Sequence, residues 1–270
     1  MKKKKSNRGK SSILPGVLFV IFLVIGVVSA FKVYEILAEY KEGKDTYASL
    51  ESFVQPAAPV EVQTQLEETV TEDESSLSTE PVQTWPAVDF EALKEMNDDC
   101  VGWILIEDTR VNYPIVQAAD NDYYLYRMFD RTWNGAGCIF MDSRVPADFS
   151  GRNHPVYGHQ MKNGTMFSAI SGYKNQEYYD THQTGYLMTP DGAYQIEFFA
   201  GFVSATSGNA WDLEFDSDED FSAWLESLQR RSCFASEVQP GAEDTIITLS
   251  TCSYEFDDAR FVLFGRLVRL

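Results

Sequence analysis

One cysteine in the C-terminal part of the chain lies where nucleophilic chemistry is possible. Cys252 ends the segment TLSTC, and Arg260 stands eight residues later, after an acidic loop. A free thiol is mostly protonated near neutral pH, so a cysteine nucleophile needs a nearby cation or imidazole that favours the thiolate. A histidine can also donate a proton to a leaving amine. Cys252 is therefore a candidate nucleophile if such groups lie beside it.

The segments on either side of Cys252 are predicted to position it. Residues 244–251 (DTIITLST) and 259–268 (ARFVLFGRLV) read as strands, joined by the seven residues SYEFDDA. If the two strands pair as an antiparallel hairpin, Cys252 ends one strand where Arg260 begins its neighbour. The thiol and the guanidinium are then expected at the same rim of a sheet.

The chain has three histidines, His154, His159 and His182. His159 follows Gly158 at the end of a predicted strand, 154–158, and so is also expected at a rim. His154 begins that same strand, and His182 lies in the polar loop DTHQTG; both are predicted to be solvated surface groups. His159 is therefore the histidine predicted to act with Cys252.

The rest of the C-terminal region is predicted to be mostly β, with few helices. A helix is expected over 88–99, started by Asp89, and a second helix follows Ser217, which forms a capping box with Asp220. In this second helix, the apolar residues at helical spacing are Phe221, Trp224, Leu225 and Leu228. The other predicted strands are 101–106, 111–116, 137–141, and two runs joined by the turn Pro190-Asp191-Gly192. Many short strands favour a closed or nearly closed β-barrel.

The N-terminal residues have a composition typical of a membrane-spanning segment. Residues 1–10, MKKKKSNRGK, contain six Lys or Arg and no acid, and residues 13–31 are uncharged. At ~1.5 Å per residue this run matches a ~30 Å hydrocarbon core, and the positive-inside rule places the N-terminus in the cytoplasm. A cleaved signal peptide with a site at Val28-Ser29-Ala30 is the alternative, but the apolar run exceeds the usual ~7–15 residues. A single-pass anchor in the cell membrane is therefore expected.

Composition divides the chain into four parts. The predicted parts are a cytoplasmic basic tail (1–12), a transmembrane signal anchor (13–31), a helical stalk with an acidic disordered spacer (32–84), and an extracellular domain (85–270). The spacer is rich in Glu, Thr, Ser and Pro, and cannot bury enough apolar surface to offset its ordering entropy. An acidic interaction site within it remains an alternative.

Several motifs together resemble the sortases, and class B in particular. They are TLSTC with an arginine at the start of the final strand, YGHQM upstream, and the segments VGWILIEDTRVNYPIVQAADNDYYL, GCIFMDSR and NGTMFSAI. The resemblance spans residues 88–270. It implies an eight-stranded sortase-type β-barrel with an N-terminal helix and a long helix before the last two strands, so that 85–270 is the catalytic domain.

The resemblance also implies an activity and roles for individual residues. Sortases cut a C-terminal sorting signal of secreted proteins, hold the acyl fragment as a thioester, and pass it to an amine of a lipid-linked peptidoglycan precursor. Carried over, Cys252 is the nucleophile, His159 the general acid and base, and Arg260 the group that stabilises the oxyanion. Ser250, Thr251 and Tyr157 are candidate contacts for the signal peptide. Class B resemblance suggests a signal like NPQTN or (S/P)PxTG.

Other functions fit the sequence less well. A net charge of −19, concentrated outside the basic tail, argues against nucleic-acid binding. The four cysteines show no metal-ligand spacing, so no metal and no cofactor is expected; Cys138 is predicted to be core, and a disulfide between two cysteines stays possible. Alternative functions are another cell-wall cysteine enzyme, and a catalytically silent surface binding module on the same barrel. The first lacks its expected motifs, and the second should have lost one of the three key residues.

Overall fold

The computed structural model describes residues 13–55 and 85–270. The chain divides into two compact units, one ending at Gly43 and one running from Lys44 to Leu270. Helix α1 (Ile13–Leu50) supplies the described part of the first unit and is long and apolar enough to cross a membrane. Its large apolar side chains are exposed from Val17 to Phe31. These features are compatible with the span predicted over 13–31.

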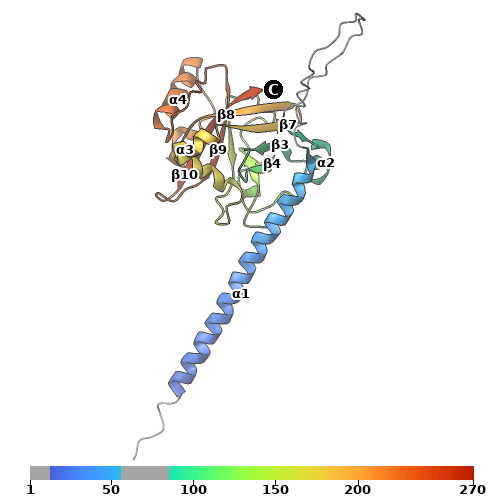
Figure 1. Cartoon of the computed structure of the whole chain (residues 1–270), viewed down its shortest axis with the longest axis vertical. Helices are drawn as coiled ribbons and strands as arrows, with labels where there is room; N and C mark the ends of the chain where they lie inside the picture. Colours follow the sequence, from blue (N-terminus) through green and yellow to red (C-terminus); the bar gives the residue numbers. More distant parts are fainter. Residues whose placement is uncertain (1–12, 56–84) are drawn as a thin grey trace, which may run out of the picture. The chain divides into compact units, whose positions relative to one another are not determined.

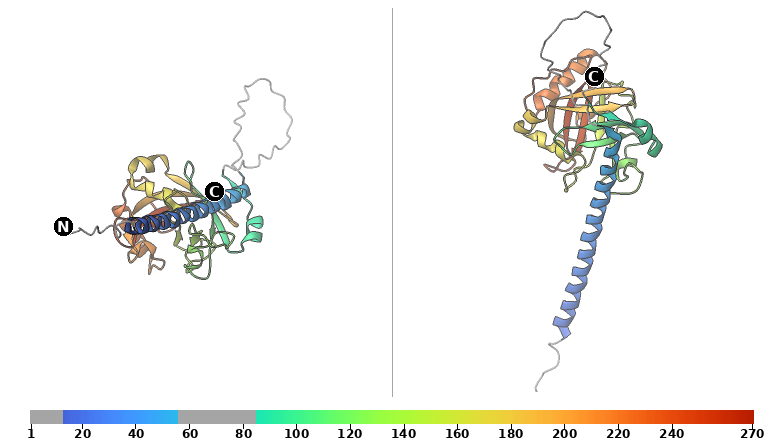
Figure 2. Two further views of the ribbon diagram at one scale, coloured as in Figure 1. Left: turned by 90° about the horizontal axis from the view of Figure 1, so that it is seen from below. Right: turned by 45° about the vertical axis from the view of Figure 1, so that its right-hand side comes forward.

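The second unit is a closed barrel of eight strands in the order β10-β8-β7-β3-β4-β5-β6-β9 (Figure 1; Figure 2, right). Two neighbouring pairs, β4–β5 and β6–β9, are parallel, and the others are antiparallel. The strands are β3 (Cys100–Leu105), β4 (Asn112–Val116), β5 (Ile139–Met141), β6 (Asn153–Tyr157), β7 (Thr184–Thr189), β8 (Gly192–Ala205), β9 (Thr245–Cys252) and β10 (Ala259–Arg269). The eight-stranded barrel predicted from the sequence is confirmed.

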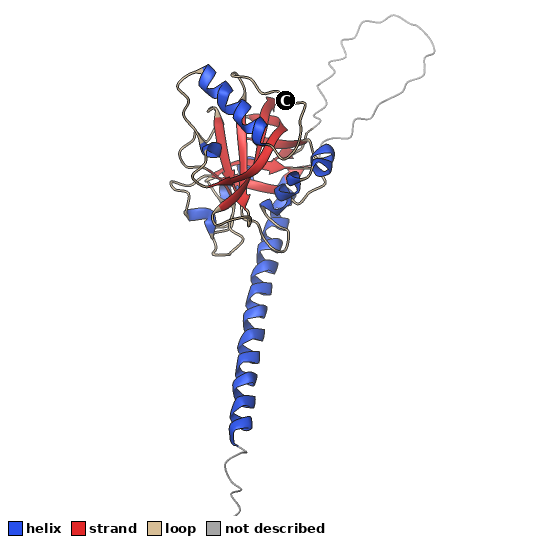
Figure 3. Cartoon of the chain, turned by 90° about the vertical axis from the view of Figure 1, so that its left-hand side faces the viewer, coloured by secondary structure: helices blue, strands red, loops and turns tan. Residues whose placement is uncertain are grey.

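Both faces of β10 are buried, which explains its nearly continuous apolar sequence. Phe261 and Leu263 belong to the main core, whereas Val262 and Phe264 belong to a second cluster. Alternate residues of a strand point to opposite faces, so one strand can serve both. The second cluster is completed by helix α4 (Asp218–Arg231), which lies outside the barrel (Figure 3).

Helix α4 begins and packs as the sequence predicts. The Ser217 hydroxyl accepts a hydrogen bond from the Asp220 amide, which satisfies one of the free N–H groups of the first turn. Asp218, Glu219 and Asp220 in that turn also complement the positive end of the helix dipole. All four apolar residues predicted to share one face are buried: Phe221, Trp224, Leu225 and Leu228.

The remaining elements are short. Asp89 caps helix α2 as predicted, accepting from the Ala92 amide. Between β6 and β7 the chain forms a 3-10 helix and helix α3, which pack against the barrel. The bounds are η1 (Glu51–Phe53), β1 (Val54–Gln55), β2 (Ala87–Val88), α2 (Phe90–Met96), η2 (Tyr123–Leu125), η3 (Phe167–Lys174), α3 (Gln176–Thr181) and η4 (Asn209–Trp211).

The barrel unit begins earlier than the boundary predicted at residue 85. Tyr47 and Leu50, in the last turns of α1, are buried in the main core, and the Tyr47 hydroxyl donates to the Gly137 carbonyl. Strand β1 then pairs with β2. The helical pattern of the stalk continues directly from the apolar span, so nothing in the pattern indicates that these residues belong to the barrel. The predicted acidic spacer falls mostly on residues 56–84, outside the described residues.

Candidate active site

The last two strands place Cys252 and Arg260 opposite each other. β9 and β10 pair antiparallel, and Arg260 is the register partner of Cys252. The Ser253 amide donates to the Ala259 carbonyl at 2.9 Å and closes the connecting loop. Lys174 on η3 stabilises the same loop, because its ammonium group donates to the Ser253 hydroxyl and to the Glu255 carboxylate. The hairpin predicted from the sequence therefore brings thiol and guanidinium to one rim.

His159 reaches this rim because β6 runs parallel to β9. Tyr157 and Ser250 are register partners, and the Gly158 amide then donates to the Ser250 carbonyl at 3.1 Å. The Thr251 hydroxyl donates to the Gly158 carbonyl at 2.8 Å. A Cβ at position 158 would lie 2.5 Å from Ile139 Cδ1 and 2.7 Å from Phe167 Cγ, so any larger residue would have to displace two buried side chains.

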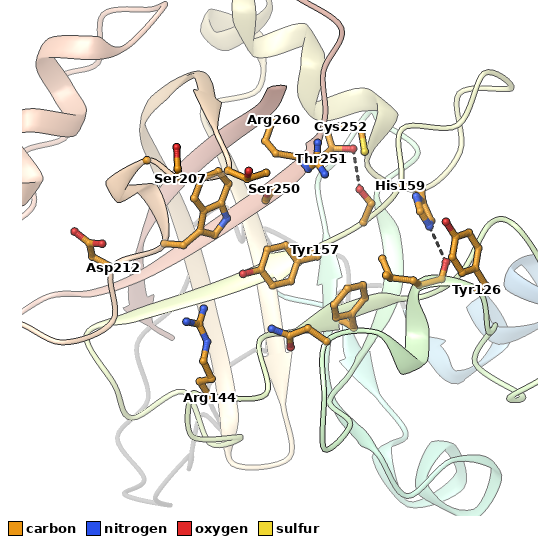
Figure 4. Close-up of a pocket in the computed structure, with 17 residues that line it drawn as sticks. Tyr126, Arg144, Tyr157, His159, Ser207, Asp212, Ser250, Thr251, Cys252 and Arg260 are labelled. Atoms are coloured by element: carbon orange, nitrogen blue, oxygen red, sulfur yellow. Dashed lines mark hydrogen bonds between the residues drawn. The ribbon is translucent and has the colours of Figure 1, made fainter. Parts of the chain in front are cut away.

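A backbone carbonyl holds the imidazole of His159. Its Nε2 lies 2.6 Å from the Leu125 carbonyl oxygen, which fixes Nε2 as the protonated nitrogen (Figure 4). The Tyr126 ring packs against the imidazole at 5.7 Å between ring centroids. The general acid and base candidate is therefore oriented by the last residue of η2 and by the residue that follows it, both far away in the sequence.

The thiol and the imidazole shift each other's pKa in opposite directions. Interaction with His159 lowers the pKa of Cys252, burial opposes this, and the positive charge of Arg260 lowers it further. Interaction with Cys252 raises the pKa of His159 against the effect of burial. Burial raises the pKa of both Cys100 and Cys138 to about 12, and it also raises that of Cys233. Cys252 is thus the cysteine whose environment favours the thiolate.

The three groups open into a pocket of about 640 Å³. Cys252, His159 and Arg260 line one end of it, and Arg144 and Asp212 lie toward the other end (Figure 4). The segment between β8 and α4 forms part of its wall and contributes Thr206, Ser207, Gly208, Trp211 and Asp212. An elongated pocket that ends at a thiol can hold an extended peptide.

Ser250, Thr251 and Tyr157, the candidate contacts for the signal peptide, all line this pocket. The hydroxyls of Thr251 and Tyr157, however, already donate within the protein. Thr251 holds the Gly158 carbonyl, and Tyr157 donates to Asp142 Oδ2 at 2.8 Å. The Tyr157 ring packs on Phe140 at 5.3 Å and forms part of the wall.

Several lining residues were not singled out in the sequence. Arg144 makes two hydrogen bonds to Asp142, at 2.9 and 2.7 Å. Burial of Asp142 is outweighed by its hydrogen bonds from Arg144, which lower its pKa to about 2. The other lining residues not assigned before are Asn121, Leu125, Tyr126 and Phe140. Asn121 and Leu125 belong to the segment NDYYL, whose resemblance to sortases was the available signal.

The structure corrects the prediction for His154. This residue is fully buried; its Nε2 lies 3.1 Å from the Gly151 carbonyl oxygen, and its ring packs on Phe149. His182 is half-buried and stacks on Tyr178 rather than standing free in solvent. Cys138 is in the core, as predicted. All four cysteines lie within the described residues and are free, so the possible disulfide is not formed.

Comparisons with known proteins agree with this architecture. No family model matches the chain. Sortase B of Listeria monocytogenes is 36% identical over 178 residues, which cover 65% of this chain and 72% of that protein. A crystal structure of sortase B from B. anthracis superposes with a TM-score of 0.70 at 32% identity, covering 87% of this chain and 100% of that chain. A Staphylococcus aureus sortase B–substrate complex gives 0.64 at 32% identity, covering 67% and 85%.

The fold and these relatives define a cysteine transpeptidase of the sortase class. The closed mixed barrel with its N-terminal helix matches the sortase B structures. Two curated sortases B are at least 33% identical, and the match covers 72% and 75% of their lengths. The chain belongs to the sortase B family.

Proposed function

We propose that this sortase cleaves a C-terminal sorting signal through a thioester on Cys252 and transfers the acyl fragment to a peptidoglycan amine. The observation that carries the proposal is the convergence of three side chains at one end of one pocket. Arg260 is the register partner of Cys252, and the pKa values of Cys252 and His159 shift toward the charged forms of both. Thiolate and imidazolium are the protonation states that the first step needs.

In the first step the Cys252 thiolate attacks the scissile carbonyl carbon of the signal. The carbonyl oxygen takes up the negative charge, and the Arg260 guanidinium stabilises it, an effect commonly worth about 3–4 kcal/mol in the transition state. His159 then donates its proton to the amide nitrogen, the C–N bond breaks, and the C-terminal fragment leaves as an amine. The N-terminal fragment remains as a thioester.

In the second step an amine replaces the departed fragment. His159, now neutral, takes a proton from the incoming amine, which attacks the thioester carbonyl. The tetrahedral intermediate collapses with loss of the Cys252 thiolate, and an amide bond forms. Because Nε2 of His159 is held by the Leu125 carbonyl, the other ring nitrogen is the one free to exchange protons.

Ser250, Thr251 and Tyr157 have a supporting role in this proposal. Thr251 ties the Gly158 turn to β9 and so sets the distance between histidine and cysteine. Tyr157 and Ser250 line the pocket where the signal peptide would lie. The clients are secreted proteins with a sorting signal, and the acceptor is a lipid-linked peptidoglycan precursor.

The N-terminal helix fits the same function. We propose that residues 13–31 anchor the enzyme in the cell membrane, with residues 1–12 cytoplasmic and the catalytic unit outside. The basic cluster before the apolar run supports this orientation. An anchor of this kind keeps the enzyme where exported clients and lipid-linked precursors meet.

A peptide screen tests the proposal. The full-length enzyme in detergent is incubated with a library of sorting-signal pentapeptides and a soluble amine, and products are separated by mass. We expect cleavage of a restricted set, with ligation to the amine, and no product from the Cys252→Ala variant. Cleavage by that variant at the wild-type rate would contradict the assignment of the nucleophile.

A further inference from the structure

An exposed pair of aromatic rings lies next to the active site. Trp133 is 68% exposed and Tyr126 is 46% exposed. Their rings stack at 5.3 Å with 22° between the planes, and the Tyr126 ring also packs against His159, with 5.7 Å between the ring centroids. Tyr126 therefore links the exposed indole of Trp133 to the imidazole of His159. Large apolar side chains exposed together in this way commonly mark a binding surface.

A rigid hairpin presents this pair. The Met128 amide donates to the Thr132 carbonyl at 2.9 Å, and the Asn134 amide donates to the Tyr126 carbonyl at 3.0 Å. Met128 and Phe129 at its tip are fully buried. The backbone next to the aromatic residues is therefore fixed, and their exposure does not arise from a loose loop.

Contacts with neighbouring side chains also fix Arg131 at the tip of the hairpin. Arg131 adopts a positive φ of 66° and donates to Asn97 Oδ1 at 2.8 Å, and it contacts the carboxylates of Asp98 and Asp99. A non-glycine residue in this conformation needs surrounding contacts that stabilise it. The contacts keep the hairpin in place and leave the two rings available.

Tyr126 lines the pocket at the end beyond His159, and Trp133, which stacks on Tyr126, is not one of the lining residues. Figure 4 shows Asp212 and Arg144 on one side of Cys252 and Tyr126 beyond His159 on the other. A signal peptide that fills the pocket from Arg144 to Cys252 leaves the Tyr126 side uncovered. The incoming amine must reach His159 to lose its proton, so this open side is its available approach.

The chemistry of the surface indicates which part of the acceptor it fits. The exposed indole of Trp133 offers apolar surface, and the Arg127 guanidinium, which lies over the ring at 6.0 Å from its centroid, offers N–H donors beside it. A pyranose ring has complementary features, since its C–H face packs on an aromatic ring while its hydroxyls and acyl groups accept hydrogen bonds. A flexible stem peptide has no comparable flat face.

Resting on the function proposed above, we infer that Tyr126 and Trp133 form a docking surface for a sugar ring of the peptidoglycan acceptor. Docking there holds the amine beside His159 while the thioester is still intact. It favours transfer to the wall over hydrolysis by water. The surface acts on the second substrate and has no part in cleavage of the signal.

Two acceptors that differ in one feature test this inference. The full-length enzyme is given a sorting peptide together with either a bare stem peptide or the same stem peptide linked to its disaccharide. We expect the wild type to have an acceptor kcat/KM about tenfold higher for the disaccharide-linked acceptor than for the bare peptide. One additional ring contact can supply a ratio of this size. Trp133→Ala should remove this preference and leave the bare peptide and the cleavage rate without acceptor unchanged.

The controls separate the possible failures. Met96→Ala changes another exposed apolar side chain, on α2, and should behave as the wild type. Equal use of both acceptors by the wild type, or an undiminished preference in Trp133→Ala, would overturn the inference. Failure of the wild type to cleave any sorting peptide would instead count against the proposed function.

Discussion

Strand β6 has a histidine near each end, and the two lie in opposite environments. His154 is enclosed by the barrel, and burial lowers its pKa. His159, just past the other end, lies at the rim, where the interaction with Cys252 raises its pKa. The imidazole of His154 is therefore held in the neutral form, whereas that of His159 is placed to carry a proton in the proposed mechanism. Closure of the barrel, rather than residue type, sets this difference.

Removing each imidazole should separate the two roles most clearly. We expect His159→Ala to reduce transpeptidation by about 10³-fold, within the range usual for a lost general acid and base. His154→Ala should keep near-normal activity but lower the free energy of unfolding by about 2–4 kcal/mol, as for other truncations of buried side chains. Initial rates and urea unfolding of both variants provide the measurement. Similar losses of activity in both would mean that the rim histidine has no special role.

Two of the three arginines of β10 extend the comparison along one strand. Arg260 faces Cys252, whereas Arg266, farther along the strand, makes an ion pair with Glu197. Arg260→Lys should lower kcat/KM by about 10²-fold, because an ammonium cannot reproduce the planar fork of donors at the oxyanion. Arg266→Lys should change it less than about threefold, since that side chain lies away from the pocket. Near-normal turnover by Arg260→Lys would remove Arg260 from the mechanism.

The N-terminal boundary can be tested by stability. Removing residues 1–43 keeps Tyr47 and Leu50 in the core, whereas removing 1–84 deletes both and strand β1. We expect the shorter protein to lose about 3–5 kcal/mol of unfolding free energy relative to the longer one, since each buried side chain contributes about 1.5–3 kcal/mol. Urea unfolding of the two proteins measures the difference. Equal midpoints would show that the barrel is complete from residue 85.

The smallest expected effect is a difference between Cys252 and Cys233 in the pH at which the thiol reacts. The pKa of Cys252 is lowered by His159 and that of Cys233 is raised by burial. Because iodoacetamide reacts with thiolates, Cys252 should be alkylated at lower pH than Cys233 in the same sample. His159→Gln should move the Cys252 midpoint upward and leave Cys233 unchanged. A common midpoint for the two cysteines in the wild type would contradict the rim environment.

Local features of the sequence could be predicted well. The caps at Asp89 and Ser217 are short-range hydrogen bonds, and the four apolar positions of α4 follow helical spacing. The pairing of Cys252 with Arg260 also depends on one hairpin. In each case the residues that interact lie within a few positions of one another, so the pattern in the sequence carries the information.

Long-range features could not be predicted from spacing alone. The Leu125 carbonyl that accepts from His159, and the Asp142 carboxylate that accepts from Tyr157, come from strands and loops brought together by barrel closure. The burial of His154, at the start of a predicted strand, could not be predicted, because it depends on β9 lying parallel beside β6. The buried residues of α1 gave no signal because they continue the helix that begins in the apolar span.

The most direct test of the account is the identity of the acylated residue. The full-length enzyme is mixed with a cleavable sorting peptide without any amine, quenched in acid, digested and examined by mass spectrometry. We expect the N-terminal fragment on the peptide that contains Cys252, with release by hydroxylamine as a thioester requires. Acylation of Cys233, Cys138 or Cys100, or turnover with no adduct on Cys252 under any quench time, would contradict it.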